Sequence, residues 1–106
     1  MNLEFKEANV EDVFGTSFHY GYVENTAYEI EKVLGKCSDV FDDGKTQYEW
    51  DKQIGSITFT VYDYKSFSAP YQVYKYHIGT KCKEDTMMVV ALLKETGLNA
   101  IYEQKF

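Results

Sequence analysis

The sequence predicts an α+β fold, in which an antiparallel meander sheet of about four to five strands carries two helices packed on one face as a two-layer sandwich. Two observations support this prediction. Several segments alternate apolar and polar residues, as half-buried strands do, and short turns join them. Two other segments space their apolar residues as helices do, and each has its own start and stop signals. A chain of 106 residues is expected to form a single domain, residues 1–106.

The first part of the chain predicts strands followed by a helix. Residues 3–5 alternate briefly and indicate an edge strand, and residues 17–23 alternate with aromatic side chains on one side. Thr26 is then a candidate N-cap, because Glu29 three residues later completes a capping box. Gly35 lies where a helix commonly ends. We therefore expect a helix between Thr26 and Gly35.

Two strands are predicted in the middle of the chain. Residues 45–51 place Tyr48 and Trp50 on one face, and residues 56–64 form the strongest strand pattern of the sequence. In the second of these strands, one face is apolar and is expected to meet the core: Ile57, Phe59 and Val61.

The last part of the chain predicts a strand, a helix and a final strand. Residues 72–78 place Tyr76 and His77 on opposite faces, and residues 98–102 suggest a last strand. Acidic residues after Lys83 suit the N-terminus of a helix that ends at Gly97. This helix is expected to be well buried because its apolar face is wide: Met87, Met88, Val90, Ala91, Leu92 and Leu93.

Composition restricts the possible partners. The formal net charge is −6 and every basic residue is Lys, so the chain lacks the Arg side chains that read phosphates and guanine edges. Direct binding of duplex DNA is therefore not expected. Ten tyrosines in a chain of this length suit a binding surface, since Tyr combines an apolar ring with a hydroxyl group. An acidic, Tyr-rich surface favours a basic partner.

The sequence indicates a cytoplasmic protein with reduced thiols. Cys37 and Cys82 are far apart, and no secretory signal or membrane-spanning apolar run is present. We expect no cofactor and no bound metal, because two His and two Cys residues lack the close spacing of zinc ligands. The candidates for nucleophilic catalysis are Cys37 or Cys82 with His19 or His77, and no spacing or motif supports any combination. Cys82 follows a predicted strand end closely and could lie near His77.

One set of residues could bind a small ligand. If adjacent strands bring them together, they would form an aromatic floor with cationic donors, which suits a stacked base or a phosphate. The set is Lys45, Trp50, Tyr62, Lys65 and His77. The alternative is that Trp50 belongs to the core and that the others are ordinary sheet residues.

The chain also resembles a family of small accessory proteins of bacteriophages and large DNA viruses. The resemblance covers roughly residues 16–93 and is carried by an ordered pattern. The pattern comprises Gly35, Lys45-Thr-x-x-Glu-Trp50, Thr60-Val-Tyr-Asp-Tyr-Lys65 and Tyr76-His-Ile-Gly79. It implies a viral accessory protein, and small acidic proteins of this kind commonly antagonise host defences.

Two hypotheses of function follow. The first is a non-enzymatic counter-defence inhibitor in the host cytoplasm that covers a basic, nucleic-acid-binding face of a host defence protein. Its expected partner-binding residues, besides Tyr62, are Asp39, Asp42, Asp43, Tyr48, Glu49 and Tyr64. The second is a protein that sequesters a nucleotide signal with the five-residue set described above, at the interface of a homo-oligomer. A Cys82/His77 enzyme is the least favoured alternative.

Overall fold

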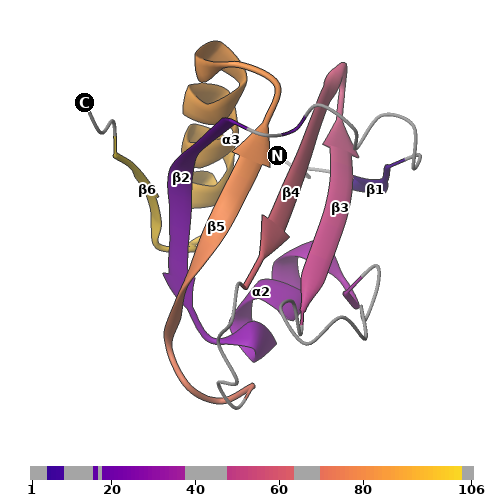
Figure 1. Ribbon diagram of the computed structural model, residues 1–106. Coiled ribbons are helices and arrows are strands. Elements are labelled where there is room, and N and C mark those ends of the chain that lie inside the picture. Colours follow the sequence, from indigo (N-terminus) through magenta and orange to yellow (C-terminus); the bar gives the residue numbers. More distant parts are fainter. Residues whose placement is uncertain (1–4, 9–15, 17, 38–47, 64–69, 104–106) are drawn as a thin grey trace.

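The computed structural model describes residues 5–8, 16, 18–37, 48–63 and 70–103 (Figure 1). In this part of the chain, two helices accompany one six-stranded antiparallel sheet, which confirms the α+β class. The sheet is larger than the predicted four to five strands, because the short strands expected near both ends of the chain each form one of its edges. The first of them lies at Lys6–Glu7, after the predicted residues 3–5, of which 3 and 4 lie outside the described residues.

The strand order is β1-β3-β4-β5-β2-β6. The bounds are β1 Lys6–Glu7, β2 Phe18–Asn25, β3 Glu49–Ile54, β4 Ile57–Tyr62, β5 Tyr74–Thr80 and β6 Ala100–Tyr102. Only β3, β4 and β5 form the predicted meander. The chain crosses from β2 to β3 through a helix, so β2 pairs with the far strand β5 and β6 then pairs with β2.

Helix α2 (Ala27–Leu34) forms as its end signals predict. The Thr26 hydroxyl accepts a hydrogen bond of 3.1 Å from the Glu29 N–H, and the Glu29 carboxylate accepts one of 3.0 Å from the Thr26 N–H. These reciprocal bonds confirm the capping box. At the other end, Gly35 has a φ of 85°, a conformation that favours glycine, and ends the helix.

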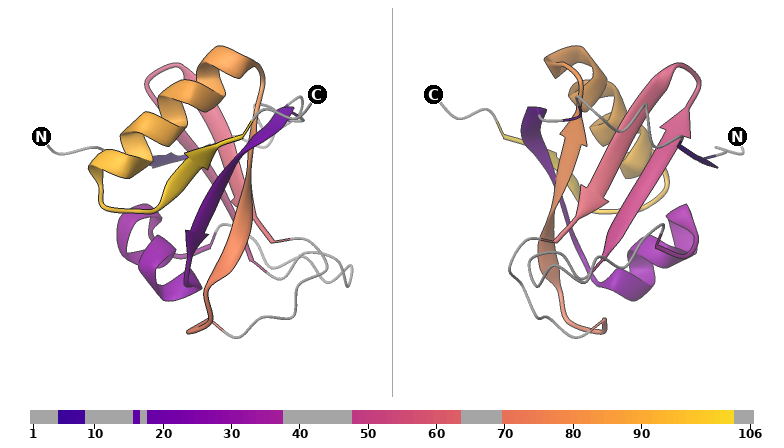
Figure 2. Two further views of the ribbon diagram at one scale, coloured as in Figure 1. Left: turned by 90° about the vertical axis from the view of Figure 1, so that its left-hand side faces the viewer. Right: turned by 45° about the vertical axis from the view of Figure 1, so that its right-hand side comes forward.

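Helix α3 (Lys83–Glu95) stands on the same side of the sheet as α2, as the left view of Figure 2 shows. Its buried residues are Thr86, Val89, Val90 and Leu93. The predicted apolar face is only partly correct. Val90 and Leu93 are buried and Leu92 is half-buried, but Met87 and Met88 are each about half exposed and Ala91 is exposed. The side chains that pack toward the sheet include Thr86, whose hydroxyl contacts the hydroxyl of Thr80 in β5, and this leaves both methionines on the other side of the helix.

The core lies between the sheet and the two helices. The predicted inward face of β4 is confirmed, because Phe59 and Val61 are fully buried there. Gly21 in β2 lets α3 approach the sheet closely, since a Cβ atom at Gly21 would lie 3.0 Å from the Thr86 side chain. Within the described ranges, neither helix has the length and apolar character needed to cross a bilayer.

Candidate functional site

Three rings form a row on the sheet face that is turned away from both helices. They come from three adjacent strands: Tyr22 from β2, His77 from β5 and Tyr62 from β4. The His77 ring lies 5.4 Å, centroid to centroid, from each of the two tyrosine rings. We call Tyr22, His77 and Tyr62 the ring row. It exists because residues that are directly opposite one another on paired strands point to the same face.

Charged side chains border the ring row. The ammonium group of Lys75 lies 4.3 Å from the centroid of the Tyr22 ring and 2.9 Å from a carboxylate oxygen of Glu103. The hydrogen bond that Lys75 donates to the Glu103 carboxylate raises the pKa of Lys75 above its ordinary value, so this lysine stays charged. Glu24 lies opposite Lys75, and Glu49 lies opposite Tyr62. Among the described residues, three carboxylates thus accompany one ammonium group around the rings, which makes this part of the surface acidic.

The two ends of this face differ in accessibility. Thr58 and Thr60 of β4 belong to the same face as Tyr62 but are buried. Tyr62 and His77 are only half-buried, while Tyr22 is nearly covered at 7% exposure beneath Lys75. The region available to a partner is therefore the end of the face around Tyr62 and His77, with the acidic residues beside it.

The structure divides the ligand-binding set that the sequence suggests. Tyr62 and His77 are stacked neighbours, but Trp50 lies opposite Val61 on the helix-facing side of β3 and is 2% exposed. Trp50 therefore cannot share a surface with the other two, because alternate residues of a strand point to opposite faces. Lys45 and Lys65 lie outside the described residues.

The expected partner-binding residues are also divided. Glu49 lies on the face of the ring row, whereas its neighbour Tyr48 stacks on Trp50 with ring centroids 6.1 Å apart. Glu49 thus lies on the same face as the ring row, and Tyr48 lies on the opposite side. We call the ring row, with the charged residues that border it, the acidic surface. The other four, Asp39, Asp42, Asp43 and Tyr64, lie outside the described residues.

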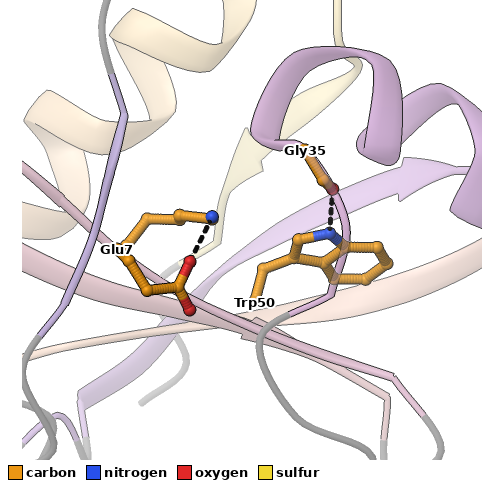
Figure 3. Close-up of polar contacts among 4 residues, drawn as sticks. Glu7, Gly35 and Trp50 are labelled. Carbon is orange, nitrogen blue, oxygen red and sulfur yellow. Dashed lines mark hydrogen bonds and ion pairs between the residues drawn. The ribbon is translucent and has the colours of Figure 1, made fainter.

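A pocket lies where Tyr48 and Trp50 approach helix α2. It is open to solvent and has a volume of about 370 Å³. Its walls come from α2, from the residues that follow it, from the beginning of β3 and from Pro70. The lining residues are Ala27, Tyr28, Glu31, Lys36, Cys37, Tyr48, Trp50 and Pro70. The indole N–H of Trp50 donates a hydrogen bond of 2.8 Å to the carbonyl oxygen of Gly35, which holds the ring in place (Figure 3).

His77 and Cys82, a candidate catalytic pair, have different neighbours. The His77 ring lies between two tyrosine rings, and Cys82 is the N-cap residue of α3, where its carbonyl oxygen accepts hydrogen bonds from Thr80 and Thr86. Cys37 and Cys82 do not form a disulfide. Among the residues that the structure places, no three His, Cys, Asp or Glu side chains are grouped as a metal ion would require.

Sequence reasoning missed four residues of the acidic surface: Tyr22, Glu24, Lys75 and Glu103. Alternation correctly places Tyr22 and Lys75 on strand faces, but it does not reveal that β2 pairs with β5. The sequence shows that Tyr22 is an aromatic residue on a strand face, but it does not show that His77 is its neighbour. Comparisons of the chain with family models, with curated proteins and with solved structures find no match.

Proposed function

We propose that this chain is a non-enzymatic binding protein that covers a basic surface of a partner protein with the acidic face around the ring row. The observation that carries the proposal is the stacking of Tyr62 on His77 with Glu49 directly opposite Tyr62 in the sheet. Half-buried rings supply contact area at low cost in side-chain entropy, and the neighbouring carboxylates select a basic partner.

The overall charge supports the same mode of binding. A net charge of −6 accelerates encounter with a basic partner at low salt, and a bordering carboxylate favours one orientation of the complex. Because Glu24 and Glu49 come from β2 and β3, the acidic residues flank the rings from both sides. A ring row enclosed by carboxylates fits a Lys- or Arg-rich face better than a nucleic acid backbone.

The proposed biological role is that of a viral accessory protein that inhibits a host defence protein in the host cytoplasm. The sequence resemblance to phage and viral accessory proteins supports this part of the proposal. Nucleic-acid-binding proteins expose the basic surfaces that such an inhibitor would cover, and coverage would prevent nucleic acid from binding there. The inhibitor would need no chemical step of its own.

The test compares two charge-reversed variants as bait for proteins in a host lysate. Glu24→Lys with Glu49→Lys changes the acidic face, and Glu84→Lys with Glu95→Lys makes the same change in charge on α3. Glu24, Glu84 and Glu95 are exposed and Glu49 is half-buried. The first variant should lose the basic proteins that the unchanged chain retains at low salt, and the α3 variant should keep them. Equal retention of the same proteins by both variants would refute the proposal.

Tyr62→Ala examines the rings separately from the charges. Removal of this half-buried ring should weaken binding at both low and high salt, because the contact that it supplies is not electrostatic. The purified partner should also release a labelled oligonucleotide when the unchanged chain is added. If the oligonucleotide stays bound while the chain is also bound, the chain does not act by covering the nucleic-acid-binding face.

A further inference from the structure

We propose that the pocket beside α2 is a second binding site, which takes one planar aromatic ring of nucleobase size from a small, uncharged ligand such as a nucleoside. The pocket is lined by Trp50 and Tyr48 on the helix-facing side of the sheet, while the ring row lies on the other side. The inference is therefore independent of the proposed protein-binding function, and either can fail without the other.

The size and the walls of the pocket suit a small ring. Its volume of about 370 Å³ lies near the lower end of the range for ligand pockets, so the part of a ligand that enters it is small. Most of the lining is aromatic or aliphatic, with Tyr28, Tyr48, Trp50, Ala27 and Pro70 in the walls. Walls of this kind favour a flat, apolar face over a sugar or a phosphate.

The aromatic wall is held in place before any ligand binds. The Trp50 ring is restrained by the hydrogen bond to Gly35, and its plane lies within 21° of the plane of the Tyr48 ring. The backbone of Tyr48 is fixed in turn by Asp63, which is 1% exposed: Tyr48 N–H donates to the carboxylate over 2.8 Å, and Asp63 N–H donates to the Tyr48 carbonyl over 3.2 Å. A preorganised wall lowers the cost of binding.

Two exposed charges of opposite sign restrict the ligand further. Glu31 and Lys36 both line the pocket, so the described part of the lining carries no net charge. A neutral base can donate to the carboxylate and accept from the ammonium group with its polar edge. Among the described lining residues, a ligand with several phosphates would meet one lysine and would be repelled by Glu31, which favours a neutral ligand over a nucleotide polyanion.

The chain contains reporters of the site. Trp50 is the only tryptophan, and Cys37 lines the pocket, whereas Cys82 is the N-cap residue of α3. Helix α3 begins at the end of the sheet away from α2 (Figure 1). We would titrate the protein with adenosine and uridine, excite Trp50 selectively, and use ribose as the control without an aromatic ring. In parallel, alkylation of each cysteine would be followed by peptide mass spectrometry. The expected result is a saturable change in Trp50 emission and slower alkylation of Cys37, with Cys82 unaffected.

Variants then assign the binding to the pocket. Tyr28→Ala removes a lining ring that is 53% exposed, and Tyr71→Ala removes a ring that is 71% exposed and does not line the pocket. Tyr28→Ala should weaken adenosine binding on the order of tenfold, as loss of one stacking ring does, and Tyr71→Ala should have no effect. Both changes leave the core intact.

Three results would overturn the proposal. The first is the absence of both the Trp50 response and the protection of Cys37 with every ring compound at millimolar concentration. The second is an equal loss of binding in Tyr28→Ala and Tyr71→Ala. The third is binding of N-acetyltryptophanamide alone, which would mean that the pocket receives a side chain of a partner protein.

Discussion

The indole N–H of Trp50 in β3 is bonded to the carbonyl oxygen of Gly35 over 2.8 Å, across the end of helix α2. Gly35 adopts a positive φ of 85°, which ends the helix. The bond thus joins the terminus of α2 to the first strand of the meander. It also explains why Trp50, at 2% exposure, is part of the core and yet forms a wall of the pocket.

Trp50→Phe should destabilise the protein by roughly 2–4 kcal/mol. The smaller ring leaves a void and removes the hydrogen bond to the Gly35 carbonyl. Urea unfolding followed by circular dichroism measures the loss, since the variant has no tryptophan. Tyr71→Phe, at a position that is 71% exposed, is the control and should be close to neutral. An unchanged midpoint for Trp50→Phe would show that the bond contributes nothing to folding.

Gly21→Ala should cost about 1–3 kcal/mol, because the added methyl group would lie 3.0 Å from Cγ2 of Thr86 and 3.1 Å from Cβ of Ile78. Thr86→Ser removes that Cγ2 but keeps the hydroxyl group that contacts Thr80. The double variant should therefore be less destabilised than the sum of the two single changes. Strict additivity in denaturant unfolding would rule out a clash between β2 and α3 as the cause.

The capping box predicts a loss of stability in acid. The hydrogen bond from the Thr26 backbone N–H lowers the pKa of Glu29 below its ordinary value of 4.5. A carboxyl group whose pKa is lowered by folding contributes stability above its unfolded pKa, and this contribution disappears as the pH falls through the folded pKa. Glu29→Gln should therefore reduce the slope of stability against pH below about pH 5. Glu31→Gln, at an exposed position two residues further along α2, is the matched control.

Thr26→Ala examines the other half of the same motif. Loss of the hydroxyl that accepts from the Glu29 N–H over 3.1 Å should cost about 1 kcal/mol at neutral pH. Thr26→Ser preserves that acceptor and should retain most of the stability. Thermal unfolding of the two variants measures the difference. Equal melting temperatures would show that the Thr26 hydroxyl does not stabilise the start of α2.

The ion pair between Lys52 and Glu7 predicts an asymmetric response to mutation. The Lys52 side chain is 7% exposed, and its ammonium group lies 2.6 Å from the carboxylate of Glu7, which is 56% exposed (Figure 3). Glu7→Gln leaves a buried charge without its counterion and should cost about 1–3 kcal/mol. Lys52→Met removes the charge as well and should cost less. A greater loss for Lys52→Met in urea unfolding would contradict this reasoning.

Tyr76 predicts a loss of stability in alkali. Burial, with the nearby negative charge of Asp63, raises the pKa of Tyr76 above its ordinary value of 10.0. Because folding raises the pKa of Tyr76, the contribution of its neutral hydroxyl to stability is fully present below the unfolded pKa. That contribution is lost as the pH rises from the unfolded pKa through the folded pKa. Tyr76→Phe should make stability fall less steeply above about pH 10 than in the unchanged chain. The exposed Tyr71→Phe should leave that slope unchanged.

Local signals determined a large part of the fold. The capping box at Thr26 and Glu29 needs only residues three positions apart, and it forms as the sequence predicts. The same holds for β4, where alternation alone assigns Phe59 to the core and Thr60 to the opposite face. These features depend on neighbours in the chain, so the sequence is enough to predict them.

The candidate sites depended on contacts between distant segments. Tyr22 meets His77 because β2 pairs with β5, 55 positions further along the chain, and alternation says nothing of which strands are neighbours. The rotation of α3, which exposes Met87 and Met88, accompanies the burial of Thr86 against Thr80 together with Val89, Val90 and Leu93. The sequence by itself thus determined which residues share a strand face or begin a helix. Only tertiary packing decided which faces meet, because the free energy of burial depends on contacts that no local pattern specifies.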